Sequence, residues 1–241
     1  MNLDKINAIR YAVCGIGYLK VPEEESLKDP MLDPFEVMGT GFLIGSGLVL
    51  TAAHVLDDLK EKLRKRPEPF EKMVQFGYPQ ADQWRVEYRS FREFEVNDRA
   101  DWATIEVGPV GETVRPVLAV GREYQLRIEE EIGMCGYAHG SILLRKGRTV
   151  DRFGPVLQRG HIAALSPYDG VRPQAMLLDV IAAPASSGSP VFLPSTGQVI
   201  GMLLKGQEGR TAALSVAIPF YREGDRFITT FSPVRPAEPT T

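Results

Sequence analysis

Short strand-like runs, separated by glycine and proline, recur along most of the chain. The 241 residues include 23 Gly and 18 Pro, and strands this short need many turns that tolerate unusual backbone angles. The runs are AIRYAVCGIGYL, EVMGTGFLIGSGLVLTAAH, MVQFGY, WRVEYRSF, DWATIEV, IEEEIGMCGYA, VLQRGHIAALS, AMLLDVIAA, PVFLP, QVIGMLLKG and ALSVAIPF. This spacing predicts an all-β protein, an antiparallel barrel or sandwich. Because 44% of the residues are hydrophobic, one domain or two intimate halves with a substantial core is expected.

One segment has the period of a helix instead. In HVLDDLKEKLRKRP, an apolar stripe is formed by Val55, Leu56, Leu59 and Leu63, and Pro67 is expected to end the helix. Its basic residues are interleaved with acidic ones and have no aromatic platform beside them. They therefore indicate a solvated helix face rather than a patch that binds anions.

Charge and hydropathy exclude several classes of partner. The formal net charge of −3 gives no basic excess for nucleic acid, and no run approaches the roughly 20 apolar residues that span a bilayer. The N-terminal YAVCGIGYL leads into VPEEESLKDP without a cleavage pattern, so we interpret it as a first strand rather than a signal peptide. Cys14 and Cys135 lie far apart and in no metal-spaced cluster, which favours a reducing compartment and predicts a cytoplasmic protein.

Among the three histidines, His54 is the best candidate for a general base. Small residues precede it in TAAHV and leave a cleft beside its ring, whereas His139 and His161 are interpreted as structural. A general-base histidine needs a carboxylate on its other ring nitrogen, and Asp101 at the head of DWATIEV is suited to that. Taken alone, Asp101 is better explained as a loop carboxylate.

A nucleophile is expected in AAPASSGSPVF. A serine attacks only when a base removes its proton and backbone N–H groups on a tight turn hold the developing oxyanion. Ser186, Ser187 and Ser189 compete for that role. By itself, this stretch is equally typical of an ordinary turn between two strands.

Taken in order, TAAHV, DWATI and SSGSPV resemble the His, Asp and Ser motifs of trypsin-like serine proteases. The resemblance implies two six-stranded antiparallel β-barrels with the active site in the cleft between them. Residues 1–119 are expected to form the N-terminal barrel and residues 120–231 the C-terminal barrel. A crossover is expected at about residues 107 to 121, and a disordered tail at residues 232–241.

The same resemblance implies a serine endopeptidase with His54, Asp101 and Ser187 as its triad. The oxyanion would be held by the N–H groups of Ala185 and Ser187, and neither a metal nor an organic cofactor is required. The family usually has Gly where this chain has Ala185, and Ala in a Gly conformation costs on the order of 1 kcal/mol. The expected partners are a protein or peptide substrate and a regulatory protein.

Within the family, GQVIGMLLKG and LSVAIPF are similar to strands of the bacterial HtrA-like branch, although no PDZ-sized segment follows the second barrel. The base of the substrate pocket is expected at Ile181, with walls at Leu204, Lys205 and Gly206. A pocket without a carboxylate at its base favours a small or medium apolar side chain. Lys205 at the rim would favour an acidic one instead.

Two other functions stay open. The fold could serve as a binding or regulatory module with little turnover, an alternative that the unusual Ala185 favours and the complete triad disfavours. A non-proteolytic esterase is hard to distinguish from a protease by sequence. The α/β-hydrolase alternative is disfavoured, because ASSGS lacks the first Gly of the G-x-S-x-G motif and a strand follows it.

Overall fold

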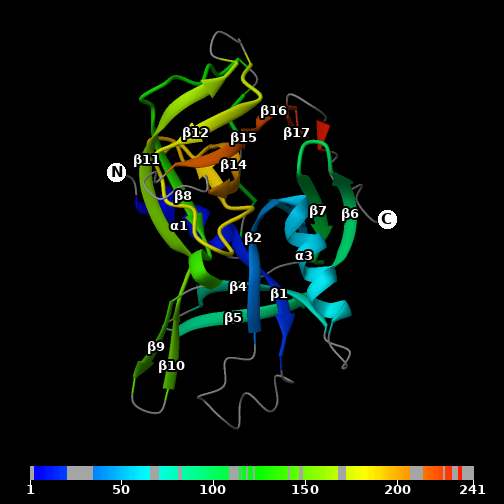
Figure 1. Cartoon of the computed structure of the whole chain (residues 1–241). Coiled ribbons are helices and arrows are strands. Elements are labelled where there is room, and N and C mark those ends of the chain that lie inside the picture. Colours follow the sequence, from blue (N-terminus) through cyan, green and yellow to red (C-terminus); the bar gives the residue numbers. More distant parts are fainter. Residues whose placement is uncertain are drawn as a thin grey trace.

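The computed structural model describes residues 3–20, 35–65, 71–80, 83–108, 114, 116–117, 119–121, 123–140, 142–146, 149–167, 172–206, 214–224, 226–229 and 233–234. In these residues the chain is mostly antiparallel β-structure, organised as one seven-stranded sheet and one closed six-stranded barrel (Figure 1). The all-β, antiparallel fold class predicted from the sequence is therefore confirmed.

The seven-stranded sheet carries the first half of the chain, in the order β5-β4-β1-β2-β3-β7-β6. Its strands are β1 (Val13–Leu19), β2 (Phe35–Gly45), β3 (Leu48–Thr51), β4 (Lys72–Gln80), β5 (Gln83–Ser90), β6 (Arg92–Asn97) and β7 (Trp102–Glu106). It has one strand more than the predicted barrel, because β6 pairs with β7 as a separate strand. Its two end strands, β5 and β6, do not pair with each other within the described residues.

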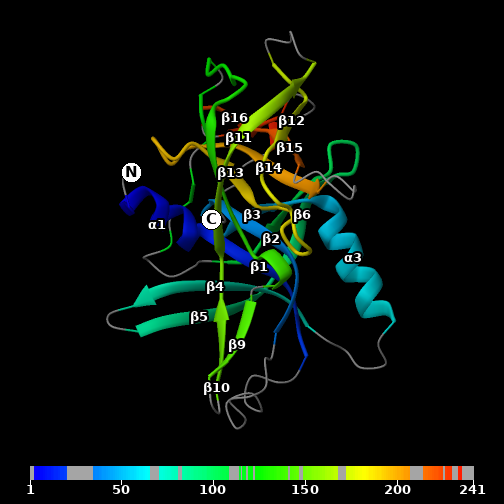
Figure 2. The same ribbon diagram turned by 60° about the vertical axis from the view of Figure 1, so that its left-hand side comes forward.

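The second half forms the closed barrel, in the order β11-β12-β15-β14-β13-β8. Its strands are β8 (Glu131–Gly136), β11 (Val156–Ser166), β12 (Ala175–Leu178), β13 (Pro190–Phe192), β14 (Val199–Gly206) and β15 (Ser215–Pro219). Between β8 and β11 lie the short 3-10 helix η1 (Ala138–Gly140) and the hairpin of β9 (Ile142–Lys146) and β10 (Thr149–Phe153). This hairpin projects from the barrel toward the side of β4 and β5 (Figures 1 and 2).

A helix precedes β1, where the sequence predicted strand from Ala8 onward. α1 spans Leu3–Ala12, and the strand begins only at Val13. Ile6, Ile9 and Ala12 are all buried, and their spacing of three places them on one side of a helix. That side packs against β1 and β4. The expectation of strand from Ala8 was therefore wrong, because tertiary packing rather than hydrophobicity decides that this segment is a helix.

The predicted helix after His54 is confirmed as α3 (Ala53–Arg64). Its buried stripe includes Val55, Leu56 and Leu59, and Leu63 is partly buried against the same core. Pro67, which was expected to end the helix, lies outside the described residues. Its lysines form ion pairs, Lys60 with Glu93, Lys62 with Glu36 and Lys65 with Glu61. These pairs fit a solvated helix face better than an anion-binding patch.

The two halves share part of their core. The larger buried cluster, formed mainly by the first half, also contains Cys135, Tyr137 and Phe192 from the second. Both Cys14 and Cys135 are buried and free. Because the cluster runs across both halves, it does not mark a division at residue 119, which stays a prediction.

The C-terminal part of the chain forms a three-stranded sheet of β16 (Tyr221–Glu223), β17 (Arg226–Ile228) and β18 (Pro233–Val234). The tail expected to be disordered thus contains a short strand, which pairs Val234 with Phe227. Ser232 and residues 235–241 of that predicted tail lie outside the described residues. No helix in the described part of the chain has the length and apolar composition needed to cross a membrane.

Candidate active site

Two adjacent strands bring His54 and Asp101 together. β3 ends at Thr51 and leads into α3, where His54 is the second residue, and Asp101 immediately precedes β7. Thr51 lies opposite Ala103 in the β3–β7 pair, so both side chains emerge at the same end of the sheet. Nδ1 of His54 lies 2.8 Å from Oδ2 and 3.0 Å from Oδ1 of Asp101.

This contact sets the electrostatics of the imidazole. The hydrogen bond to Asp101 raises the pKa of His54 above its ordinary value, and the charges of Asp101 and Asp58 act in the same direction. Burial and the positive charge of Lys205 lower that pKa but do not cancel the increase. Because the carboxylate accepts the proton on Nδ1, the neutral ring keeps Nε2 as an acceptor, the form that a general base requires.

Of the three candidate serines, Ser187 differs from its neighbours in exposure. Ser186 and Ser189 are buried, and both hydroxyls are used inside the loop. The Ser186 hydroxyl accepts from the N–H of Ala183, and the Ser189 hydroxyl donates to the carbonyl of Ser186. Ser187 is half-buried, which leaves it as the serine that an incoming ligand could reach.

The hydroxyl of Ser187 donates to the carbonyl of Leu204 at 2.6 Å. Leu204 lies at an irregularity of β14, between Leu203, which pairs with Ala217, and Lys205, which pairs with Val216. Among the described residues, the hydroxyl of Ser187 donates to this carbonyl and not to His54. It must therefore leave the Leu204 carbonyl before it can donate to the imidazole.

The loop that carries Ser187 packs directly against the first half of the chain. Gly188 has a φ of +88°, and a Cβ added to it would lie 1.9 Å from the Thr40 carbonyl oxygen and 2.7 Å from the Thr51 hydroxyl. Only glycine permits this approach. Since Thr51 ends the strand that leads to His54, the loop lies beside the His54 segment.

Every carbonyl from Pro184 to Ser187 accepts a hydrogen bond. The N–H of His139 donates to Pro184 and the hydroxyl of Thr40 to Ala185. The N–H and hydroxyl of Ser189 both donate to Ser186, and the N–H of Thr40 donates to Ser187. Since the C=O and N–H of one trans peptide point in opposite directions, the bonds to the Pro184 and Ser186 carbonyls also fix where the N–H groups of Ala185 and Ser187 point.

Neither of those two N–H groups donates to any residue that the structure describes. Both remain available to a ligand oxygen, as an oxyanion-binding turn requires. Ala185 holds a φ of +66°, the left-handed conformation that makes Gly usual at this position. Alanine in place of the usual glycine therefore keeps the left-handed geometry at residue 185.

A family model of the trypsin-like peptidase domain matches residues 39–202. The chain belongs to the trypsin-like peptidase family. The crystal structure of Deg5 is 18% identical with a TM-score of 0.58, covering 90% of this chain and 88% of that one. Rv3671c from M. tuberculosis H37Rv, solved as the inactive form of a serine-to-alanine mutant, is 16% identical with a TM-score of 0.56, covering 90% and 85%. At these identities the likeness is one of fold, and no curated protein matches the sequence.

The residues expected to line a substrate pocket in this member of the trypsin-like peptidase family lie in two places. Leu204, Lys205 and Gly206 end β14 beside Ser187, and the charge of Lys205 reaches His54. Ile181 is 61% exposed. Its backbone N–H and carbonyl are both held by the side-chain amide of Gln158 on β11, at 3.2 and 3.0 Å.

A second histidine–aspartate pair occurs on the C-terminal barrel of the peptidase domain. Nδ1 of His161 lies 3.2 Å from Oδ2 of Asp179, and the backbone N–H of His161 also donates to that carboxylate. Both side chains are about half exposed. This pair bridges β11 and the residue after β12, which supports the interpretation of His161 as structural.

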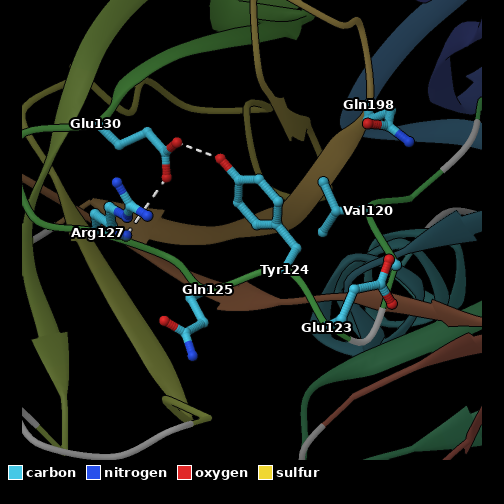
Figure 3. A pocket seen from close by; sticks show the side chains of 8 residues that line it. Val120, Glu123, Tyr124, Gln125, Arg127, Glu130 and Gln198 are labelled. Carbon is cyan, nitrogen blue, oxygen red and sulfur yellow. Dashed lines mark hydrogen bonds between the residues drawn. The ribbon is translucent and has the colours of Figure 1, made fainter.

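The domain also has a pocket of about 530 Å³ that contains none of the triad candidates. It is lined by Val120, Gly121, Glu123, Tyr124, Gln125, Arg127, Glu130 and Gln198. The Tyr124 hydroxyl points across it to the Glu130 carboxylate, which also accepts from the backbone N–H of Arg127 (Figure 3). Burial raises the pKa of Tyr124 to about 12. These bonds hold the turn before β8 together.

Sequence reasoning missed Thr40 and the backbone of His139. Thr40 belongs to an apolar strand, and its partners Tyr137 and Ala185 lie 97 and 145 residues away. Only the position of Thr40 in the segment GTGF, within the family match, could have drawn attention to it.

Proposed function

We propose that this chain is a serine endopeptidase that hydrolyses peptide bonds through an acyl-enzyme on Ser187. The observation that carries the proposal is the pair of N–H groups of Ala185 and Ser187, which the fixed carbonyls orient and no described residue uses. A turn that only joined two strands would have no need to fix four successive carbonyls. The contact between His54 and Asp101 supports the same function, because it holds a base in the required tautomer.

In the proposed reaction, the hydroxyl of Ser187 first leaves the Leu204 carbonyl and turns to Nε2 of His54. His54 takes the hydroxyl proton while the oxygen attacks the substrate carbonyl, and Asp101 stabilises the imidazolium. The N–H groups of Ala185 and Ser187 hold the oxyanion. His54 then gives its proton to the departing amine, which leaves the acyl group on Ser187.

Water completes the proposed cycle. His54, neutral again, removes a proton from a water molecule that attacks the acyl carbonyl. The second tetrahedral intermediate collapses, and the proton returns to the oxygen of Ser187. These steps use side chains and backbone groups of this chain alone.

Labelling with a fluorophosphonate tests the nucleophile. The wild-type protein should be labelled, Ser187→Ala should not, and Ser195→Ala should match the wild type, because Ser195 is an exposed serine in the turn after β13. Cleavage of internal bonds in a peptide library then separates an endopeptidase from an esterase. Wild-type protein that stays unlabelled in every condition would favour the binding or regulatory module.

The proposed substrates are proteins or peptides with a small or medium apolar side chain at the cleaved bond. The supporting feature is a β14 end without a carboxylate, formed by Leu204, Lys205 and Gly206. The competing preference for an acidic side chain depends on Lys205, which is exposed. Cleavage-site profiles of the wild type and Lys205→Met decide between the two.

We also propose that the protein acts in the cytoplasm and that a regulatory protein partner restrains it. Buried, free Cys14 and Cys135 are compatible with a reducing compartment. Fractionation of cells that produce the protein from its natural gene tests the location. Cross-linking of the inactive Ser187→Ala protein in the same cells tests for a partner that is not itself cleaved.

A further inference from the structure

Thr40 is the residue through which the first half of the chain reaches the Ser187 loop. It lies in the middle of β2, is fully buried, and belongs to neither the triad nor the substrate pocket. Its hydroxyl donates to the Ala185 carbonyl at 2.8 Å, and its backbone N–H donates to the Ser187 carbonyl at 2.8 Å. One residue therefore holds two of the four fixed carbonyls.

The direction of the Thr40 hydroxyl is itself determined by a third bond. The backbone N–H of Tyr137, just after β8, donates to Oγ1 of Thr40 at 2.9 Å. A hydroxyl has one proton and accepts through its lone pairs. With Tyr137 on the acceptor side, the proton is directed to Ala185. The Thr40 carbonyl in turn accepts from the Thr51 hydroxyl at 2.7 Å, which ties the same point to the strand before His54.

Ala185 is the residue that most needs such a bond. Its φ of +66° is unfavourable for any residue with a Cβ, so the loop gains less from its own backbone preference than a glycine loop would. The peptides before and after Ala185 together define its backbone angles, and the carbonyl of the preceding one is held by the N–H of His139. Rotation of the Ala185–Ser186 peptide would remove the other restraint and let Ala185 leave the strained left-handed conformation. The bond from the Thr40 hydroxyl opposes that rotation, because the carbonyl would lose its partner in a partly buried site.

We propose that Thr40 is a positioning residue: its hydroxyl, from the first half of the chain, fixes the peptide that follows Ala185 and so keeps Ala185 in the left-handed conformation that presents its N–H to the oxyanion. The proposal rests on the proposed function, since it concerns the same site. It assigns to β2 a role in the transition state rather than in substrate binding. Loss of the hydroxyl should therefore lower kcat and leave KM nearly unchanged.

Thr40→Val tests this, because valine keeps the shape and the backbone N–H but removes the hydroxyl. Thr104→Val is the matched control: Thr104 is also a fully buried strand threonine, and its hydroxyl has no hydrogen-bond partner in the described part of the chain. Thr40→Ser restores the hydroxyl. If Thr40→Val does not fold by circular dichroism, Thr40→Ala removes the hydroxyl without adding bulk near Tyr137.

Loss of a whole oxyanion donor costs about 100- to 1000-fold in kcat. Thr40 is not itself a donor and acts only by supporting one, so its effect should be smaller. We expect Thr40→Val to lose about 10- to 100-fold in kcat, and to bind a peptide aldehyde, which forms a tetrahedral adduct on Ser187, more weakly by a similar factor. Thr40→Ser should recover most of both losses, and Thr104→Val should show neither. Equal kcat and aldehyde affinity in Thr40→Val and Thr104→Val would overturn the proposal.

A crystal structure of Thr40→Val gives a readout independent of turnover. The expected result is an Ala185–Ser186 peptide rotated away from residue 40, with the Ala185 φ outside the left-handed region. A loop that superposes on the wild-type loop would overturn the positioning role even if no substrate is ever found. Failure of the wild-type protein to label with fluorophosphonate, by contrast, would contradict the proposed function and not this placement.

Discussion

Oδ1 of Asp101 accepts two hydrogen bonds from one residue, from the backbone N–H of His54 and from its ring Nδ1, each at 3.0 Å. α3 has no side-chain cap of its own, because its N-cap residue is Ala52. Asp101 therefore acts as the cap of this helix while it orients the imidazole. A carboxylate at a helix N-terminus is also favoured by the helix dipole.

This double contact predicts that two substitutions of Asp101 have different effects on stability. Asp101→Asn keeps an oxygen that can accept from the His54 N–H, so unfolding should change little, whereas Asp101→Ala should lose about 1 kcal/mol. Both should lose kcat, by about 10,000-fold for the asparagine variant, because the ring loses its carboxylate. Urea unfolding and steady-state kinetics measure the two effects separately. Equal unfolding midpoints for the two variants would contradict the capping role.

The raised pKa of His54 predicts the acid limb of the pH profile. A general base must be neutral, so kcat/KM should rise with pH through a midpoint above the ordinary histidine value of 6.5. Asp101→Asn removes the carboxylate whose hydrogen bond is the largest cause of the raised pKa, and should move the midpoint to lower pH. Lys205→Met removes a positive charge that lowers the pKa and should move it to higher pH. Midpoints that move together would exclude this assignment.

The same pKa has a consequence for stability. Because the folded state binds the His54 proton more tightly than the unfolded chain does, protonation stabilises the fold below the unfolded pKa. That contribution disappears as pH rises through the higher folded pKa. Wild type and His54→Gln should therefore converge in unfolding free energy as pH increases across that window, which thermal unfolding at several pH values can measure.

The close approach at Gly188 predicts a severe effect of a single methyl group. In Gly188→Ala the Cβ would meet the Thr40 carbonyl oxygen, so the loop must move, and both stability and activity should fall. Gly224→Ala is the control: its φ of +62° is also left-handed, but nothing lies within 4 Å of the added Cβ. The control should lose only about 1 kcal/mol from the backbone strain. Similar melting temperatures for the two variants would show that the contact with Thr40 is not limiting.

The pocket assignment is tested by Ile181→Asp. If Ile181 lies at the base of the substrate pocket, a carboxylate there should raise kcat/KM for substrates with Arg or Lys at the cleaved bond, relative to Leu, by about 10-fold or more. Stability should be unaffected, since the isoleucine side chain is 61% exposed. Gln158→Asp places a carboxylate on the neighbouring β11 as a comparison. An unchanged preference in Ile181→Asp would place the pocket base elsewhere.

Parts of this fold that depend on local pattern could be predicted from the sequence. The stripe of Val55, Leu56 and Leu59 predicted α3, and the ordered motifs around His54, Asp101 and Ser187 predicted the double-barrel architecture. α1 was missed because Ile6 and Ile9 lie in a short segment that runs directly into the strand-like YAVCGIGYL. β6 was missed because no turn residue separates it from β5.

The loop geometry could be predicted only in part. The resemblance drew attention to Ala185, but whether its backbone would adopt the left-handed conformation depends on bonds from distant segments. Thr40 and His139 supply these bonds, and no pattern in either segment marks them. Contacts between residues far apart in the chain arise from the pairing of whole sheets, which a motif does not encode.

The hydroxyl of Ser187 lies on the Leu204 carbonyl in this structure, and the proposed reaction requires a second orientation of the same side chain, toward His54. Partly exposed side chains change rotamer within picoseconds to nanoseconds, whereas typical enzymes turn over about 1 to 1000 times each second. The two orientations would thus equilibrate many times before each reaction. The fraction of molecules with the hydroxyl toward His54 then multiplies the rate directly, and a preference of about 1.4 kcal/mol for Leu204 would slow the protein tenfold.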